Sequence, residues 1–283
     1  MRAVVCGAGV TGLALAGCLG RQGWDVVVLE RAPDPREQGC MLDFFGPGWD
    51  AAEAMGVLPA VLELGCTVER LSSVDDRGRD RAGLPFARFA RALDGRLVSV
   101  LRPDLERVLR EHARDVAELR FGQRVVGVRQ RPGGADAVLD DGTVLGADLV
   151  VGADSAQAVS LLGGQGASPG IAGAWLLAER LARAASVEDA VAGCERVWRP
   201  VVTEKQRLAR GGAQWFLPSS RARRPARRLA ALPGLDGVVT RGLVGAPGET
   251  STPSPPPEPS GAPEPARVAG SGHEKAPHRR FRW

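Results

Sequence analysis

Three glycines near the N-terminus have the spacing of a phosphate-binding turn. Gly7, Gly9 and Gly12 form the stretch "GAGVTG", between an apolar run at 3–6 and a longer run rich in Leu and Ala. In such a turn the first glycine permits the tight bend, the second lets the backbone approach a pyrophosphate, and the third allows helix and strand to pack closely. Glu30 ends the next apolar run, where a carboxylate can accept hydrogen bonds from a ribose. Together these residues predict a dinucleotide-binding site.

This site requires a strand, a helix and a second strand around the glycines. Residues 3–6 predict the first strand, the apolar positions from Leu13 to Leu19 a helix, and residues 25–29 the second strand. The helix N-terminus would offer free N–H groups and the positive end of its dipole to phosphates. The alternative is a lipoprotein signal segment, because Arg2 and an apolar stretch precede "LAGC". The glycines interrupt that stretch and a β-branched run follows it, so the strand-turn-helix interpretation is favoured.

A second candidate phosphate contact lies in "SVLRPDLERVLREHA", residues 99–113. The pattern predicts a strand end followed by a helix with Pro103 at its first position, which places Arg102 at the junction. A guanidinium there can reach a phosphate; the alternative is an ordinary surface arginine. His112 on the same helix is expected to pack against its neighbours rather than to act as a base. Residues 39–57 predict a Gly-rich, aromatic loop leading into a short helix, and a packing turn would look the same.

More strands and one further helix follow. Residues 118–149 predict an antiparallel meander with its hairpin turn at "DDG", residues 140–142, and a last buried strand that presents Asp154. The stretch "GGQGASPG" then predicts a helix with Ser168 as its N-cap and Pro169 in the first turn. The N-terminal amides of this helix could stabilise negative charge on a ligand, although an ordinary capped helix would look similar.

Composition limits the classes of protein that fit this chain. With 283 residues and 44% hydrophobic content it can build a core, and no apolar run reaches the roughly 18 residues of a membrane span. The five cysteines lack metal-ligand spacing, which predicts free thiols, no metal site and a reducing, cytoplasmic location. Residues 196–228 contain ten Lys or Arg and one Glu. A nucleic-acid surface is one interpretation; the solvated face of helices is favoured, because aromatic stacking residues are not interleaved with the charges.

On these motifs the chain resembles the FAD-dependent monooxygenases of the para-hydroxybenzoate hydroxylase type, over residues 1–245. "FFGPGWDAAEAMGV" and "GQGASPGIAGAWLLAERLA" extend the similarity. The resemblance implies an α/β, Rossmann-like FAD-binding domain with a β-meander, FAD as cofactor and NAD(P)H as transient reductant. The implied FAD contacts run from the pyrophosphate to the flavin ring: Gly7, Gly9, Thr11 and Gly12, then Glu30 and Arg31 at the end of the second strand, Arg102, Asp154 at the ribityl chain, and Gly164, Gln165, Gly166 and Ala167 toward the ring.

One departure from the family is large. The family carries a substrate-covering sheet between its "GAD" strand and its "GQG" helix, whereas here "DLVVGAD" runs directly into "SAQAVSLLGGQGAS". We therefore expect an FAD-binding domain at 1–185 from which the family's substrate domain is deleted near 154/155. A C-terminal helical region at 186–245 and a disordered Pro-rich tail at 246–283 complete the predicted organisation.

No catalytic residue is predicted, because the groups that grip the substrate in the family belong to the missing segment. The resemblance implies a small organic substrate, aromatic or polycyclic, no membrane partner, and a homo-oligomer or a completing subunit. Three hypotheses stay open. They are an FAD- and NAD(P)H-dependent monooxygenase, a non-catalytic FAD- or dinucleotide-binding remnant, and a nucleic-acid-binding protein that uses residues 196–228.

Overall fold

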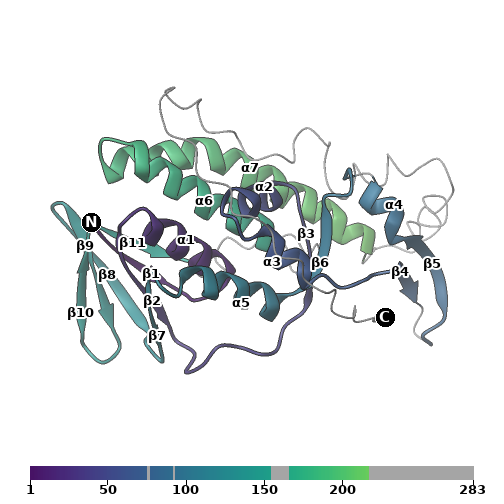
Figure 1. The fold of residues 1–283 in the computed structure, drawn as a ribbon, viewed down its shortest axis with the longest axis horizontal. Coiled ribbons are helices and arrows are strands. Elements are labelled where there is room, and N and C mark those ends of the chain that lie inside the picture. The colour runs from purple at the N-terminus through teal and green to yellow at the C-terminus, as the bar shows by residue number, and fades with distance from the viewer. Residues whose placement is uncertain (75–76, 92, 154–165, 217–283) are drawn as a thin grey trace, which may run out of the picture.

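The computed structural model describes residues 1–74, 77–91, 93–153 and 166–216. Its centre is a parallel sheet in the strand order β11-β1-β2-β7 (Figure 1). The strands are β1 (Arg2–Cys6), β2 (Asp25–Glu30), β7 (Glu118–Phe121) and β11 (Leu149–Gly152). Helix α1 (Val10–Arg21) connects β1 to β2, as the glycine spacing predicts. The α/β, Rossmann-like fold is therefore confirmed.

The sheet lies between two layers and fills a core on each side. One face packs on helices α1, α5 (Arg102–Ala113) and α6 (Ala167–Arg183), and the other packs on a β-meander (Figure 1). Successive side chains of a strand point to opposite faces, so near-continuous apolar strands supply both cores. The helical core takes Ala3, Val5, Val26 and Val28, whereas the meander core takes Val4, Val27 and Leu29.

The meander consists of β8 (Val125–Arg131), β9 (Gly134–Leu139) and β10 (Val144–Ala147), all antiparallel. The predicted hairpin turn at 140–142 joins β9 to β10, with Gly142 at φ +86°. The prediction of one antiparallel meander from residue 118 to the strand before Asp154 was wrong at both ends, because β7 pairs in parallel with β2 and β11 pairs in parallel with β1. Local alternation of apolar residues does not distinguish an antiparallel neighbour from a parallel strand that is distant in the sequence.

A two-stranded ribbon stands apart from the main sheet. Strand β3 (Met41–Phe45) pairs antiparallel with β6 (Leu97–Leu101). Strand β3 corrects the loop predicted for the first part of residues 39–57, and the short helix predicted there is α2 (Pro47–Ala54). The remaining elements are α3 (Leu58–Glu63), a second ribbon of β4 (Arg70–Val74) and β5 (Asp80–Pro85), and α4 (Phe86–Arg91). The second ribbon and α4 lie at the end of the molecule opposite the meander (Figure 1).

Two packed helices end the described part of the chain. Helix α7 (Val187–Phe216) lies along α6, and a Cβ on Gly173 of α6 would come within 2.5 Å of the indole Nε1 of Trp198. On its outer side Arg199 and Arg207 pair with Glu195 and Glu204. Helix α7 thus exposes Arg199 and Arg207 of the basic stretch to solvent, as expected, whereas Lys205 is only 5% exposed. Residues 217–245 of the predicted helical region and the predicted tail at 246–283 lie outside the described residues.

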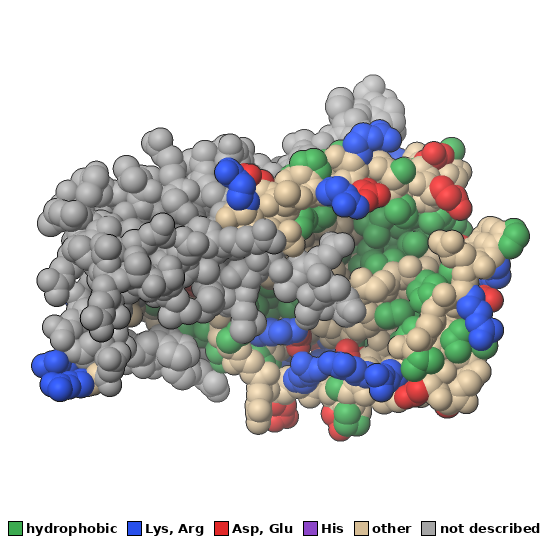
Figure 2. Space-filling view, turned by 180° about the vertical axis from the view of Figure 1, so that it is seen from behind, with side chains coloured by type: hydrophobic (Ala, Val, Ile, Leu, Met, Phe, Trp, Pro, Cys, Tyr) green, Lys and Arg blue, Asp and Glu red, His purple; other side chains and the backbone are tan. Residues whose placement is uncertain are grey.

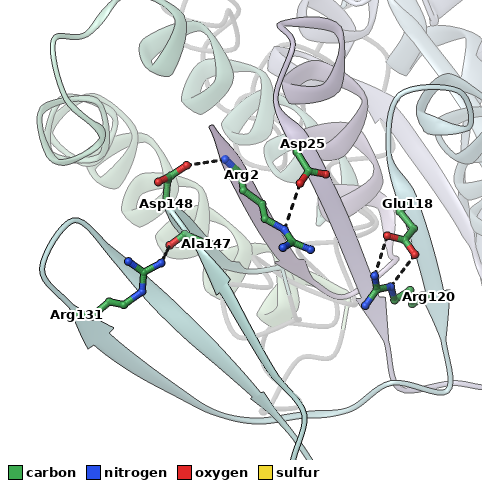
Figure 3. Close-up of polar contacts among 7 residues, drawn as sticks. All are labelled: Arg2, Asp25, Glu118, Arg120, Arg131, Ala147 and Asp148. Carbon is green, nitrogen blue, oxygen red and sulfur yellow. Dashed lines mark hydrogen bonds and ion pairs between the residues drawn. The ribbon is translucent and has the colours of Figure 1, made fainter.

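Polar contacts tie the strands together at the amino-terminal edge of the sheet (Figure 3). The backbone N–H of Arg2 donates to Oδ2 of Asp148 at 2.6 Å, and its guanidinium Nε lies 3.3 Å from Oδ2 of Asp25. Glu118 and Arg120 form an ion pair on β7. The glycine turn and Glu30 lie at the other edge, at the carboxyl ends of β1 and β2. Open α/β sheets bind their ligands at that edge.

Apolar side chains remain exposed at the meander end of the molecule (Figure 2). Three valines of the meander, Val126, Val128 and Val144, are half or more exposed. No helix among the described residues is long and apolar enough to cross a membrane.

Candidate functional site

The glycine turn has the close packing that its spacing predicts. Gly7 has φ +116°, a left-handed conformation that favours glycine, and its N–H donates to the carbonyl of Leu29 at 2.7 Å. A Cβ on Gly12 would lie 1.9 Å from the carbonyl oxygen of Gly7, a distance no side chain can occupy. Gly9 is different, because a Cβ there would meet no atom closer than 3.8 Å. The turn is therefore tight where helix meets strand and open on the side of Gly9.

Glu30 is bound to the backbone around this turn. Its Oε2 accepts the N–H of Ala8 at 2.9 Å, and its Oε1 accepts the N–H of Ala32 at 2.9 Å. A carboxylate oxygen has two acceptor sites, so these contacts leave capacity for a ribose hydroxyl. The carboxylate thus holds the turn in place and still suits the role predicted from its position. Arg31, the next residue, is exposed.

Arg102 reaches the open side of the glycine turn. Its Nη2 lies 3.8 Å from the position that a Cβ on Gly9 would take, and its Nε donates to Oε1 of Glu106 at 2.9 Å. The backbone N–H of Arg102 donates to the carbonyl of Cys40 at 3.0 Å, which fixes the start of α5 against β3. Two positive groups, the guanidinium and the N-terminus of α1, therefore lie beside the same turn. Such an arrangement is suited to a bound anion.

The first turn of α6 meets the first turn of α1. A Cβ on Gly170 would lie 2.3 Å from Oγ1 of Thr11, so the absence of a side chain lets the two helices approach. Helix α2 arrives at the same place, since a Cβ on Gly48 would lie 2.5 Å from Cα of Ser168. Helix α6 begins at Ala167, directly after Gly166, and Ala167 is 8% exposed.

Ser168 does not have the role expected from the sequence. It is the second residue of α6 rather than its N-cap, and its hydroxyl accepts the N–H of Phe45 at 3.4 Å. The N-cap position of α6 is taken by Gly166, two residues before Ser168. Ser168 therefore connects α6 to the ribbon of β3 and β6.

The structure brings together most of the predicted contacts. Gly7, Gly9, Thr11, Gly12, Glu30 and Arg102 surround the carboxyl ends of β1 and β2, with Gly166 and Ala167 at the start of the neighbouring α6. Asp154, Gly164 and Gln165 lie outside the described residues. Glu106 was not among the predicted residues, although its spacing of four residues from Arg102 on one helix is the usual spacing of an ion pair.

His112 packs between α5 and α1, as predicted. Its ring lies against Gly17, where a Cβ would come within 2.2 Å of Cδ2. Burial, together with the nearby Arg21, lowers the pKa of His112 to about 4. Within the described part of the chain its Nε2 has no hydrogen-bond partner. These features suit a neutral packing residue.

None of the five cysteines forms a disulfide bond. Among residues 1–74, 77–91, 93–153 and 166–216, no group of three His, Cys, Asp or Glu side chains could hold a metal ion.

The arrangement fits the pyrophosphate of a dinucleotide. At Gly9 the backbone is not covered by a side chain, and the guanidinium of Arg102 lies beside it. The N-terminus of α1 carries no side-chain cap. The family model described as "FAD binding domain" matches residues 1–210, and the chain belongs to this family.

Individual relatives agree with this membership. The chain is 30% identical over 174 residues to an FAD-dependent urate hydroxylase of Mycolicibacterium vanbaalenii, covering 58% of this chain and 43% of the relative. It is 33% identical over 157 residues to a rifampicin monooxygenase of Rhodococcus hoagii, covering 54% of this chain and 31% of the relative. The match thus spans less than half the length of these relatives. The crystal structure of tetracycline destructase Tet(55) superposes with a TM-score of 0.70 at 15% identity, covering 89% of this chain and 98% of that one, which shows a shared fold.

Proposed function

We propose that the chain binds FAD at the carboxyl edge of its parallel sheet. The pyrophosphate would lie on the glycine turn beside Arg102, the adenosine ribose at Glu30 and Arg31, and the flavin ring toward Gly166 and Ala167 of α6. The family resemblance adds three further FAD contacts to this proposal, namely Asp154, Gly164 and Gln165. The main support for this proposal is the position of Arg102, whose guanidinium lies 3.8 Å from the Cβ position of Gly9 at the N-terminus of α1.

Binding of FAD to the full chain tests this proposal directly. Arg102→Ala should weaken the FAD affinity by about tenfold or more, because a charge-assisted contact to phosphate contributes roughly 1.5–3 kcal/mol. Arg107→Ala is the matched control, since Arg107 is an exposed arginine on the same helix, paired with Asp104. Equal affinities of the two variants, or no FAD bound by the wild-type chain after refolding with excess cofactor, would contradict the proposal.

We further propose that the bound flavin serves an NAD(P)H-dependent monooxygenase reaction on a small aromatic or polycyclic molecule. FAD would supply the redox chemistry, as cofactors of this kind do. The contribution of the chain is to bind the cofactor on the turn, to orient it with Arg102 and α6, and to exclude water from one side with the ribbon of β3 and β6. The five scattered cysteines, without metal-ligand spacing, support a reducing, cytoplasmic location.

A non-catalytic FAD-binding remnant is the second candidate function. It is favoured by one feature of the sequence, namely that "DLVVGAD" runs directly into "SAQAVSLLGGQGAS", where the family carries its substrate-covering sheet. The two functions differ in the fate of electrons from NAD(P)H. Substrate-stimulated NAD(P)H oxidation with a matching amount of hydroxylated product would support the monooxygenase, alone or with a completing subunit or second copy. Oxidation that yields only hydrogen peroxide, or no oxidation of NAD(P)H, would support the remnant.

A further inference from the structure

The ribbon of β3 and β6 carries one polar pair in an apolar face. Its register places Asp43 opposite Ser99, with the pair Met41 and Leu101 on one side of them and the pair Phe45 and Leu97 on the other. Because side chains alternate along a strand, these three cross-strand pairs share one face. The opposite face carries Leu42, Phe44, Val98 and Val100 and packs in the main core. Asp43 and Ser99 therefore have apolar neighbours on both sides.

The two polar side chains hold each other firmly. The hydroxyl of Ser99 donates to Oδ1 of Asp43 at 2.6 Å, and Ser99 is only 1% exposed. Burial raises the pKa of Asp43, while the hydrogen bond from Ser99 lowers it. Among the described residues, the other oxygen of Asp43 has no hydrogen-bond donor. This second oxygen is not among the buried side-chain atoms of the described residues that lack a partner, so solvent or the donor group of a ligand can reach it.

The ribbon also lies between two segments assigned above to FAD. At one end, Leu101 of β6 is followed by Arg102, whose N–H bonds to Cys40. At the other end, the N–H of Phe45 bonds to Ser168 in the first turn of α6. Asp43 and Ser99 form the central pair of this short ribbon. A molecule bound on this pair would lie near the cofactor.

We propose that Asp43, held by Ser99, is a specificity-determining residue that accepts a hydrogen bond from a hydroxyl or amino group on a small ring-shaped substrate. Phe45 and Leu97 pack with Phe86 and Leu93 in a separate apolar cluster, so the pair Met41 and Leu101 takes the body of the ring. The second oxygen of Asp43 takes its donor group. This role deepens the proposed function and rests on it for the link to flavin chemistry. Recognition of the donor group itself needs only the ribbon, so it can be measured without turnover.

The test compares two probes that differ in one donor. Phenol carries a hydroxyl, whereas anisole has the same ring with that hydroxyl methylated. Saturation-transfer NMR on the full chain, with and without FAD, would measure the binding of both. Wild-type protein should prefer phenol by on the order of tenfold, and D43L/S99A should lose that preference, since a hydrogen bond to a charged group gives discrimination of this order. Removing both partners avoids leaving a buried hydroxyl without its acceptor.

A second Ser–Asp pair provides the matched control. Ser186 and Asp189 are hydrogen-bonded at 2.8 Å in an exposed position at the start of α7, so D189L/S186A should keep the wild-type preference. If D43L/S99A does not fold, as judged by its thermal transition, S99A alone should reduce the preference severalfold. Equal binding of phenol and anisole to the wild type, or an unchanged preference in both ribbon variants, would overturn the inference.

FAD binding is measured in the same samples. A chain that prefers phenol through Asp43 but binds no FAD would refute the proposed function and support the recognition site. A chain that binds FAD and does not discriminate the probes would refute the recognition site alone.

Discussion

The side chains of Arg102 and Glu106 form an ion pair at the edge of the glycine turn, with 2.9 Å between Nε and Oε1. Glu106 Oε1 itself lies 3.9 Å from the Cβ position of Gly9. The carboxylate therefore does two opposite things. It orients the guanidinium toward the turn, and it places a negative charge near the phosphates that we propose to bind there.

Two substitutions of Glu106 separate these effects. Glu106→Gln keeps an acceptor for Nε and removes the charge, so the FAD affinity should rise by about threefold, the size of a screened charge interaction over a few ångströms. Glu106→Ala removes the acceptor as well, and its FAD affinity should be lower than that of the Gln variant. Fluorescence titration of FAD measures both. A Gln variant that binds FAD less tightly than the Ala variant would contradict this division of roles.

A methyl group added at Gly12 should lower the stability of the fold, whereas one added at Gly9 should lower the FAD affinity. In Gly12→Ala the Cβ would collide with the carbonyl of Gly7, so the free energy of unfolding should fall by about 3 kcal/mol. In Gly9→Ala nothing lies within 3.8 Å, so the fold should persist while the FAD affinity falls, because the methyl group occupies the space of the pyrophosphate. Urea unfolding and FAD titration of each variant test this. Gly127→Ala, with no atom within 4 Å, is the control.

His112 should make stability depend on pH. Its folded-state pKa of about 4 lies below the ordinary value of 6.5, so the unfolded chain binds the proton more readily in this interval. The corresponding stability is present above pH 6.5 and is lost as the pH falls toward about 4. Allowing for partial solvent screening, the loss should be about 2 kcal/mol.

Replacement of His112 isolates this contribution. His112→Leu keeps an apolar contact with Gly17 and cannot titrate, so its stability should fall less than that of the wild type on acidification. Urea unfolding at about pH 7.5 and about pH 4.5 gives the comparison. The same pH dependence in both proteins would show that His112 does not contribute.

The contact between Gly173 and Trp198 should hold α7 on α6. Gly173→Val places a branched side chain where a Cβ already comes within 2.5 Å of the indole, so α7 should detach and the chain should lose about 2 kcal/mol of stability. Limited proteolysis within residues 187–207 should become faster, whereas FAD affinity should stay near the wild-type value. Gly193→Ala on α7, with its closest atom at 3.6 Å, should leave proteolysis unchanged.

Local patterns were sufficient for the elements whose signals lie close together in the chain. The turn with Gly7, Gly9 and Gly12 predicted β1, α1 and β2, and Pro103 predicted the start of α5. The start of α6 was predicted within two residues, although Ser168 was given the wrong role. The order of the strands could not be predicted from local patterns, because strands pair with partners that are distant in the sequence. The partner of β3 is more than fifty residues away in β6, and the partner of β7 is β2.

The sequence by itself determined the glycine turn, the carboxylate beside it and the family, because these depend on short spacings that force one backbone geometry. Only the tertiary structure decided that the pair of Arg102 and Glu106 lies beside Gly9, that Ser168 connects α6 to β3, and that Asp43 faces Ser99 in an apolar strip. These contacts join residues far apart in the chain. They follow from which apolar faces pack together, and that choice is made by the whole core rather than by any local pattern.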